Sequence, residues 1–445
     1  MQIKHLRLKN FKLFNDHQID FKPLTLLTGP NSCGKSTLLG ALTTILQTRS
    51  PHQFPFEFVP NGSNTSLGSY RDIATNHKTN ANIAIGITLR DGKHEIDIDG
   101  EYRYASRGNQ TLLNKLSFKS PENFLEVVWT GEQSGYQATY SAKADKALLG
   151  AVVNMIGDFA KAVDPDATKV KDVLPEIFKV VDGEVRASPL TARKPSELLE
   201  ELEKSIGPNF AIQELKRILT SFLSFADYIG PIRSFPSRHY LSEDGGSRID
   251  PFGENACITL ADWKSHYQDR YKQTINLLEL LQVASKVETK TLDDLIRIEV
   301  QPFNHSEKVN FVDVGFGVSQ VLPIVISDVA MKKGGTLLIN QPEVHLHPSS
   351  QAAFGNYFVN RLPERNYIVE THSEYLITRL RLLVVQGALK PDDLNIIYID
   401  SERSNEKSPR IFNISVTKDG AFEGAPDGFF KTYYDDSFKL AMAGL

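Results

Sequence analysis

The stretch LLTGPNSCGKSTLLGAL, residues 26–42, constrains the fold of this chain more than any other. It contains the spacing Gly29-x-x-x-x-Gly34-Lys35-Ser36, between a continuously apolar run and a segment with helical character. A strand that feeds such a loop and then a helix surrounds one point with backbone N–H groups and the positive end of a helix dipole. The ammonium of Lys35 would lie beside the β- and γ-phosphates of a nucleotide, and the hydroxyl of Ser36 would face Mg²⁺. A chance match in a loop rich in glycine and serine is the alternative, and the agreement of strand, loop and helix disfavours it.

Composition narrows the class of protein. With 41% hydrophobic and 23% charged residues in 445, the chain resembles a globular protein with one to three cores. A formal net charge of -4 gives no general attraction to polyanions, so nucleic-acid contact would need a local basic patch. The two cysteines, Cys33 and Cys257, form no disulfide framework and fit a reducing compartment. Since neither a signal sequence nor an apolar run of about 18 residues occurs, we expect a cytoplasmic protein.

Hydrophobic periodicity predicts the other elements. Three strands are expected within residues 2–29, and apolar alternation on both sides of Asp91-Gly92 predicts an antiparallel hairpin. The pattern becomes helical from about Ser141 to Phe225, then loop-rich, and helical again from Leu260 to about Lys286. In the last third, short β-rich runs alternate with helical ones, which is typical of a mostly parallel sheet covered by helices. These runs are IRIEVQPF, GGTLLIN, NYIVETHS and LNIIYID.

Several segments resemble, in the same order, those of ATPases related to the ABC and SMC proteins. They are the glycine-rich loop with its flanks, YIGPIRSFPSRHY, VGFGVSQVLPIV, LLINQPEVHLHPSSQ and YIVETHSEYLITRL. In particular, the chain resembles the overcoming-lysogenization-defect (OLD) group of ATPases. The C-terminal DGAFEGAPDGFFKTYYDDSFKLA is similar to a small domain found in a subset without a Toprim nuclease. The resemblance implies an α/β fold, an ABC-type P-loop ATPase with a mixed central sheet, an antiparallel β subdomain and an inserted helical lobe.

The resemblance also implies a division of the chain. Residues 1–104 would carry the N-terminal part of the ATPase domain, with the loop and the hairpin, and residues 291–400 its C-terminal part. Between them, residues 105–290 would form a helical insertion with a sensor-like loop segment. Residues 401–445 would form a small C-terminal domain.

In the resembled ATPases, two subunits share each ATP. The glycine-rich loop and the Walker B strand of one subunit bind ATP and Mg²⁺, while the signature segment of a second subunit closes over the γ-phosphate. Here the signature would be GFGVSQ, whose helix start can aim N–H groups at an anion, although an ordinary loop and N-cap has the same appearance. The protein is therefore expected to be a homo-oligomer, a dimer or higher. The residues expected to hold the nucleotide are Gly29, Asn31, Ser32, Gly34, Lys35, Ser36, Thr37, Gly317, Ser319 and Gln320.

The Walker B strand departs from the pattern of these ATPases. Its last residue, Asn340, takes the position of an acid that holds Mg²⁺, and Gln341 takes that of the base. An amide orients water but cannot take its proton, so general-base help of about 10²–10⁴-fold is missing or comes from Glu343 or Glu370. We expect Ser36 and Asn340 at the metal, slow turnover, and a faster rate when Asn340→Glu restores an acid.

Three histidines lie near these segments. His372 stands where the resemblance places a histidine that hydrogen-bonds the γ-phosphate or the attacking water, although a histidine at a strand end is more often structural. The expected catalytic residues are thus Glu343, His372, Asn340 and Gln341. His345 and His347 are two residues apart, as in some metal sites, but the sequence offers no third zinc ligand, and we expect packing or contact with a partner subunit.

Two functions of different kinds fit the sequence. The first is an ATPase that senses or regulates for a separate effector, a nuclease or toxin, in prokaryotic anti-phage defence, because the resembled group is rich in such systems. Roughly 70 residues follow His372, too few for a further nuclease domain. The second is a nucleotide-gated scaffold with negligible hydrolysis. A DNA repair or maintenance ATPase is a third alternative, but the sequence lacks the long coiled-coil arm expected of one.

The segment PIRSFPSRHY interleaves basic and aromatic residues, including Arg233 and Arg238. Such a pattern could meet a phosphate backbone, and a sensor loop within the ATPase is the alternative. No membrane partner is expected.

Overall fold

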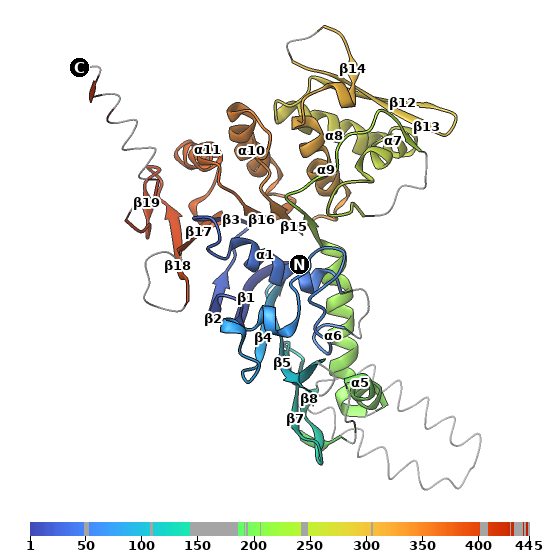
Figure 1. Cartoon of the computed structure of the whole chain (residues 1–445), viewed down its shortest axis with the longest axis vertical. Coiled ribbons are helices and arrows are strands. Elements are labelled where there is room, and N and C mark those ends of the chain that lie inside the picture. The colour runs from blue at the N-terminus through green and yellow to red at the C-terminus, as the bar shows by residue number, and fades with distance from the viewer. Residues whose placement is uncertain are drawn as a thin grey trace. The chain divides into compact units, whose positions relative to one another are not determined.

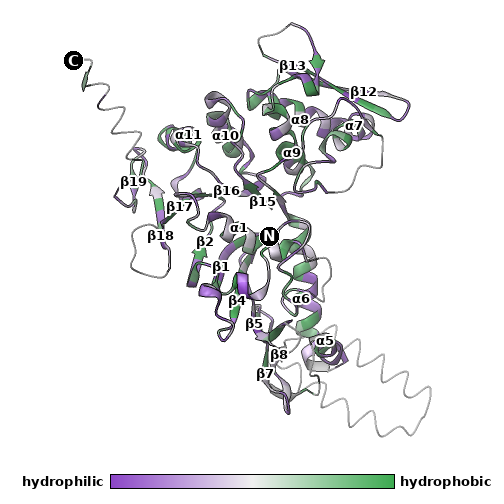
Figure 2. Cartoon of the chain, in the orientation of Figure 1, coloured by the Kyte–Doolittle hydropathy of each residue, from purple (hydrophilic) through white to green (hydrophobic). Residues whose placement is uncertain are grey.

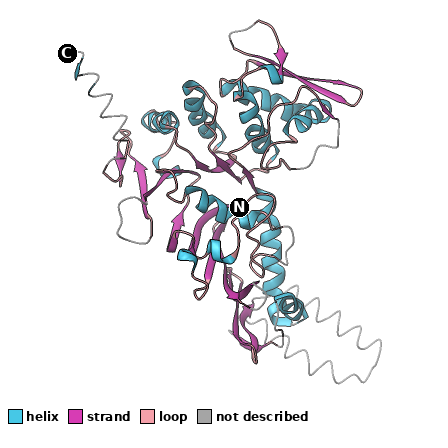
Figure 3. Ribbon diagram, in the orientation of Figure 1, coloured by secondary structure: helices cyan, strands magenta, loops and turns pink. Residues whose placement is uncertain are grey.

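The computed structural model divides the chain into two compact units (Figures 1 and 3). The first unit contains residues 3–20 and 47–223, and the second contains residues 21–46 and 224–445. The chain therefore begins in the first unit and contributes residues 21–46, a strand and a helix, to the second. It then returns to the first unit for residues 47–223 and ends in the second. The structure describes residues 1–48, 53–106, 110–142, 186–190, 192, 195–204, 206–241, 248–303, 306–400, 408–427, 429–430, 439 and 442–443.

None of the helices in these described ranges is long and apolar enough to cross a membrane.

The first unit is built on an eight-stranded sheet. Its elements are β1 (Gln2–Phe11), β2 (Phe14–Asp20), α2 (Tyr70–Ile73), η1 (Thr75–His77), β4 (Ile83–Asp91), β5 (His94–Ala105), β6 (Gln110–Lys119), β7 (Asn123–Gly131), β8 (Gly135–Ala142), β9 (Arg186–Pro189), α5 (Pro195–Lys204) and α6 (Ile206–Phe225). The strand order is β2-β1-β4-β5-β6-β7-β8-β9, and neighbours from β4 to β9 are antiparallel. Ile83, Ile85, Ile87 and Leu89 alternate along β4 and are fully buried. The predicted hairpin of β4 and β5 is thereby confirmed.

The same sheet corrects the expected helical insertion over residues 105–290. Strands β6, β7 and β8 follow β5 directly in the sheet, so the antiparallel structure continues to Ala142. Along β7, Asn123, Leu125 and Val127 are buried and alternate with half-buried residues, which is the period of a strand rather than of a helix. Helices α5 and α6 lie in the region predicted to be helical, while residues 143–185 of that region lie outside the described residues.

The second unit contains a seven-stranded mixed sheet. Its strands are β3 (Leu24–Thr28), β10 (Ala226–Ile229), β15 (Gly335–Asn340), β16 (Arg365–Glu370), β17 (Leu394–Asp400), β18 (Arg410–Val416) and β19 (Phe422–Glu423). In the order β10-β15-β16-β3-β17-β18-β19, the first five are parallel and the last two are antiparallel to their neighbours. The predicted α/β class, with a mixed central sheet and an antiparallel β subdomain, is confirmed.

Helices cover both faces of this mixed sheet (Figure 1). The helices of the second unit are α1 (Lys35–Leu46), α7 (Ala256–His266), α8 (Gln268–Leu280), η2 (Phe311–Asp313), α9 (Gly317–Ala330), α10 (Pro348–Arg361), α11 (Glu374–Val385) and η3 (Pro391–Asp393). Figure 1 shows α1 on one side of the strands and α9, α10 and α11 on the other. Helix α9 is buried continuously from Val318 to Val329 and is mainly hydrophobic (Figure 2). Leu24 and Leu26 of β3 belong to the same hydrophobic core as α9, α10 and α11.

Three further expectations in this unit need correction. The run IRIEVQPF forms β13 (Leu295–Gln301) in a separate antiparallel sheet with β11 (Tyr240–Leu241), β12 (Lys286–Leu292) and β14 (Val309–Asn310). The single helix expected over residues 260–286 is two helices, because Tyr267 between them has a non-helical φ of -135° and ψ of 61°. The described part of residues 401–445 is not a separate domain, since β18 pairs with β17 and extends the central sheet.

Candidate functional site

The glycine-rich loop connects the end of β3 to the start of α1, as its sequence predicts. Gly29 has φ +141°, and a Cβ there would lie 2.3 Å from the backbone oxygen of Ile399, so no other residue fits without movement of the chain. Ser32 also has a positive φ, of 62°, which residues with a side chain rarely adopt. Asn31, Ser32 and Ser36 are exposed at the surface of the loop. Thr37 is half-buried in the first turn of α1.

Lys35 is bonded to the loop itself. Its side chain is only 4% exposed, and Nζ donates to the backbone oxygens of Gly29 at 3.0 Å and Pro30 at 2.6 Å. These carbonyls hold the ammonium at the centre of the loop, where it can exchange them for phosphate oxygens. Cys33 is buried beneath it, and burial raises the pKa of the thiol, as suits a small loop residue rather than a reactive thiolate.

Ser36 contacts an acid that belongs to a different strand from the Walker B residues. Its hydroxyl donates a 2.8 Å hydrogen bond to Oε1 of Glu370, the last residue of β16. Glu370 is 2% exposed, and its second oxygen, Oε2, is buried without a hydrogen-bond partner among the described residues. Burial raises the pKa of this carboxyl, while the hydrogen bond from Ser36 and the charge of Lys35 act in the opposite direction.

A second acid, Glu343, lies in the loop after β15. Its Oε1 accepts a 2.6 Å hydrogen bond from the backbone N–H of His372, and its Oε2 is buried with no partner in the described part of the chain. Burial raises the pKa of Glu343, and the hydrogen bond from His372 offsets part of that rise. The pKa of His372 is lowered, first by partial desolvation and then by the nearby charge of Lys35. The structure therefore brings Lys35, Ser36, Glu343 and His372 together, with Glu370, the alternative base offered by the sequence, beside them.

The two amides of the Walker B segment have different surroundings. Asn340, at the end of β15, is 5% exposed, and its side chain lies beside the hydroxyl of Tyr228 on β10 and opposes the rise that burial causes in the pKa of that hydroxyl, while its Oδ1 has no partner among the described residues. Gln341 is half-buried, has a positive φ of 48°, and donates its backbone N–H to the carbonyl of Glu370. Both residues thus lie at the site, held by strands on either side of β15.

Arg233 is hydrogen-bonded to the backbone of the Walker B segment. It is 3% exposed, and Nη2 donates to the backbone oxygen of Asn340 at 2.7 Å, while Nη1 donates to that of Gln341 at 3.3 Å. Burial lowers its pKa to about 10, and the charge of Glu343 opposes that change. The sequence suggested Arg233 as a contact for nucleic acid, and its burial contradicts that expectation.

The signature segment forms the predicted helix start. Helix α9 begins at Gly317, where a Cβ would lie 3.2 Å from Leu346 in the loop after β15. The side chains of Ser319 and Gln320 are 6% and 4% exposed, and the Ser319 hydroxyl donates 2.8 Å back to the carbonyl of Phe316. In contrast, Gly315 is exposed, with no atom within 4 Å of the position of a Cβ. The tip of the loop is therefore the accessible part of the signature.

The two histidines after β15 have packing and capping contacts. The His345 ring lies 5.7 Å from the ring of Phe316, centre to centre, and Nδ1 of His347 accepts from the backbone N–H of Ser349 at the start of α10. Within the described ranges, no group of three His, Cys, Asp or Glu residues is arranged to hold a metal ion.

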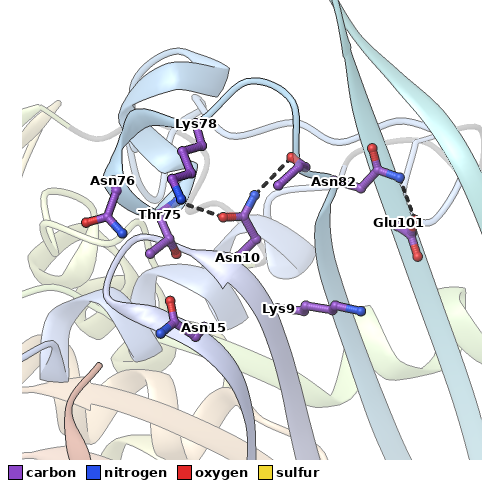
Figure 4. A pocket seen from close by; sticks show the side chains of 9 residues that line it. Lys9, Asn10, Asn15, Thr75, Asn76, Lys78, Asn82 and Glu101 are labelled. Carbon is purple, nitrogen blue, oxygen red and sulfur yellow. Dashed lines mark hydrogen bonds between the residues drawn. The ribbon is translucent and has the colours of Figure 1, made fainter. Parts of the chain in front are cut away.

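Among the cavities of the described structure, two larger ones lie apart from the loop. One, of about 420 Å³, opens beside His372 and is lined by residues of α10 and α11, including Tyr375 and Arg379. The other, of about 340 Å³, lies in the first unit, and several of its polar side chains bond to neighbouring groups (Figure 4). There Asn10 bonds the backbone at Thr75 and Ala81, and Asn82 bonds Glu101. We assign neither cavity a ligand.

The sequence offered Glu370 only as an alternative base, and its contact with Ser36 was not predicted. The positions of Arg233 and Tyr228 at the site were not predicted either. Glu370 had a usable signal, since an acid at the carboxyl end of a parallel strand lies at the edge of the sheet where ligands bind. Tyr228 lies in β10, and Arg233 follows shortly after that strand. The sequence indicated only a loop-rich segment there.

Comparison with solved structures gives similarities at low identity. The SMC head domain from Thermotoga maritima has a TM-score of 0.41 and 11% identity, over 94% of this chain and 100% of that one. The Smc head domain with an extended coiled coil, bound to the C-terminal domain of ScpA and derived from Pyrococcus furiosus, has the same TM-score and identity, over 93% and 96%. The SmcHead bound to the C-winged helix domain of ScpA has a TM-score of 0.41 and 12% identity, over 94% and 99%. A TM-score of 0.41 is too low to indicate shared activity or partners.

The comparison of sequences identifies the family. No curated protein sequence matches the chain. However, residues 1–228 and 255–377 match the profile of a family described as AAA ATPase domain. The matched ranges include the glycine-rich loop, the signature helix, the Walker B strand and His372, and they also include the strands from β5 to β8. Because the match covers most of the sequence and every part of the candidate site except Arg233, the chain belongs to the AAA ATPase domain family.

Proposed function

We propose that this chain binds ATP with Mg²⁺ in the glycine-rich loop and hydrolyses it slowly. The observation that carries the proposal is the convergence of Lys35, Ser36, Glu370, Glu343 and His372 at the carboxyl ends of β3, β15 and β16. Adjacent parallel strands end at the same edge of a sheet, and ligands of open α/β sheets bind there. Membership of the AAA ATPase domain family supports ATPase activity in general.

The residues present fit a magnesium site. Mg²⁺ prefers oxygen ligands and is commonly held by one or two carboxylates together with substrate phosphates. The free, buried Oε2 of Glu370 beside the hydroxyl of Ser36 offers such oxygens. Bound there, the ion would neutralise charge that develops on the phosphates.

Each of the other side chains has a role in this proposal. Lys35 would bind the phosphates, and His372 would hydrogen-bond the γ-phosphate or orient water. Glu343 would accept the proton of the attacking water through its unpaired Oε2, since burial raises its pKa towards neutrality, where a base is most effective. Gln341 can orient water but cannot take its proton.

Two measurements on the purified chain test the proposal. Isothermal titration calorimetry with ATP and Mg²⁺ should show binding, and a phosphate-release assay should show slow turnover. A chain that binds no ATP at millimolar concentrations, with or without Mg²⁺, would refute it.

We further propose that ATP joins two or more copies of the chain through the signature segment, in the manner of ABC-type ATPases. Gly315→Gln tests this, because the exposed loop tip can accept a side chain without a clash within the chain. Light scattering with ATP and Mg²⁺ should show assembly in the wild type and in Gly315→Ala, and monomers in Gly315→Gln that still bind ATP. Assembly of Gly315→Gln to the wild-type extent would contradict the proposal.

For the biological role, we propose that the ATPase is a sensor or regulator in prokaryotic anti-phage defence. It would control a separate effector, a nuclease or toxin. The support is the resemblance of five ordered segments to the OLD group. Expression with the neighbouring genes should protect cells in a plaque assay, and Lys35→Ala should remove the protection. Equal plaque numbers with and without the intact operon would contradict this role.

One observation favours a second candidate, a nucleotide-gated scaffold with negligible hydrolysis. Both Walker B positions that carry acids in the resembled ATPases carry amides here, Asn340 and Gln341. Phosphate release at the background level, together with tight ATP binding, would establish this alternative. For DNA repair or maintenance, the burial of Arg233 removes one of the two arginines on which the expected DNA contact rested.

A further inference from the structure

The order of strands places two candidate residues side by side at the edge of the mixed sheet. Strand β16 lies between β15 and β3, and in its register with β15, Glu370 is the partner of Asn340. On its other side, Glu370 pairs with Leu27 of β3, directly before the glycine-rich loop. Glu370 is therefore one strand closer to the loop than Asn340 is.

The hydrogen bonds separate the roles of these two residues. The hydroxyl of Ser36, the metal ligand supplied by the loop, donates to Oε1 of Glu370. The side chain of Asn340 instead lies beside Tyr228 on β10, which pairs with β15 on the opposite side from β16. Thus the carboxylate contacts the loop, and the amide is engaged on the far side.

Burial and charge point the same way. Glu370 is 2% exposed and Lys35 is its neighbouring cation, yet Oε2 of Glu370 has no hydrogen-bond partner among the described residues. An unpartnered buried carboxylate oxygen is costly unless a ligand satisfies it. Asn340 also has an unpartnered oxygen, Oδ1, but it is neutral, and Mg²⁺ favours carboxylates over amides.

We infer that Glu370 on β16, and not Asn340 on β15, is the acid that holds Mg²⁺ together with Ser36. The charge absent from the Walker B strand is supplied by the neighbouring strand, at the same edge of the sheet. Asn340 then serves as a structural residue beside Tyr228. This inference rests on the proposed function, because it names the metal-holding acid of that same site.

The test compares the effect of Mg²⁺ on ATP affinity in four proteins: the wild type, Glu370→Gln, Asn340→Ala and Glu374→Gln. Calorimetry is done with excess Mg²⁺ and again with EDTA, and the ratio of the two dissociation constants is the quantity compared. In addition, electron paramagnetic resonance with Mn²⁺ in place of Mg²⁺ and a non-hydrolysable ATP analogue reports metal binding directly. Glu374→Gln removes one carboxylate four residues away on the same segment and serves as the matched control.

We expect Glu370→Gln to bind ATP without metal as the wild type does and to lose most of the tightening by Mg²⁺. Removal of a residue that only supports a metal ligand lowers metal affinity by about 10–100-fold. Loss of the ligand itself should lower it by at least as much. Asn340→Ala and Glu374→Gln should keep the wild-type ratio. ATP binding with EDTA also shows that each variant is folded.

Two results would overturn the inference: a wild-type Mg²⁺ ratio in Glu370→Gln, or its loss in Asn340→Ala. If Glu370→Gln does not fold, Asn340→Ala alone still decides, because its full response to Mg²⁺ supports Glu370 and a lost response contradicts it. A wild type that binds no ATP under any condition would instead refute the proposed function, so the two failures are distinguishable.

Discussion

Glu343 and His372 are joined by a 2.6 Å hydrogen bond from the backbone N–H of the histidine to Oε1 of the glutamate. The bond ties the loop after β15 to the turn after β16. It occupies one carboxylate oxygen and leaves Oε2 unpaired among the described residues. A proton acceptor is thereby fixed in orientation next to the histidine that the resemblance places at the γ-phosphate.

The first prediction concerns this carboxylate. Glu343→Gln keeps the shape of the side chain but removes its ability to accept a proton. We expect phosphate release to fall by about 10²–10⁴-fold, the usual contribution of a general base, with ATP affinity nearly unchanged. Glu279→Gln, an exposed position on α8, is the control and should turn over normally. An unchanged rate in Glu343→Gln would show that the base lies elsewhere.

The sequence and the structure predict different effects of Asn340→Glu on turnover. If Asn340 were simply a lost metal-holding acid, this change would speed turnover by about tenfold or more. Since Ser36 already contacts Glu370, we expect no acceleration and a destabilised protein, because the new carboxylate would be buried beside Tyr228. The unfolding free energy should fall by about 1–3 kcal/mol, the cost of an unsatisfied buried polar group. Urea unfolding and phosphate release measure both effects, and a tenfold faster variant would favour the earlier expectation.

Lys35→Ala should abolish ATP binding. The ammonium is the cation that the loop supplies to the phosphates, and in the structure it is already held at the centre of the loop by the carbonyls of Gly29 and Pro30. Calorimetry should detect no binding at ATP concentrations that saturate the wild type. Lys390→Ala, at an exposed position before η3, removes the same charge away from the loop and should bind normally. Wild-type affinity in Lys35→Ala would place the nucleotide at another site.

The contrast between Arg233→Ala and Arg238→Ala tests whether the first arginine supports the Walker B segment. Arg233 is buried on the carbonyls of Asn340 and Gln341, so its loss should destabilise the chain by about 1.5–3 kcal/mol and slow turnover. Arg238 forms an exposed ion pair with Asp313, which is worth about 0–1 kcal/mol. Urea unfolding curves of the two variants should therefore differ clearly, and equal midpoints would contradict the supporting role.

The last prediction concerns the stability of the fold and a buried network of ion pairs around Asp328 of α9. Asp328 is fully buried and accepts hydrogen bonds from Tyr357 and Arg361, and it is ion-paired with Arg365. Asp328→Asn removes the buried carboxylate shared by two buried guanidinium groups and leaves Arg361 only its exposed partner Glu364, which should cost about 3–5 kcal/mol. Glu364→Gln removes only the exposed partner of Arg361 and should cost far less. Equal losses in the two variants would show that the buried network contributes little.

Local patterns predicted much of the fold. The apolar run of β3, the glycine-rich loop and the start of α1 were predictable because each is encoded within a few residues. The β4–β5 hairpin was predictable for the same reason, from its alternation and its Asp91-Gly92 turn. The break at Tyr267 was not, because no proline or glycine marks it.

The central contact of the site could not be read from the sequence. Ser36 and Glu370 are 334 positions apart and meet only because β16 lies between β3 and β15. Hydrophobic periodicity identifies strands but does not give their order in a sheet. The burial of Arg233 could not be predicted for a related reason. An arginine in a polar loop is usually exposed, and here its burial depends on the pairing of β10 with β15.

The hydrogen bonds of Arg233 have a consequence for communication within the second unit. Residues 229–254 lie outside the ranges that match the family. Yet Arg233 in this stretch donates hydrogen bonds to the backbone carbonyls of Asn340, the last residue of β15, and of Gln341 directly after it. Whatever displaces residues around Arg233 therefore also displaces the backbone at the catalytic edge of the sheet. A change that begins outside the matched ranges can therefore reach residues inside them through the hydrogen bonds of a single side chain.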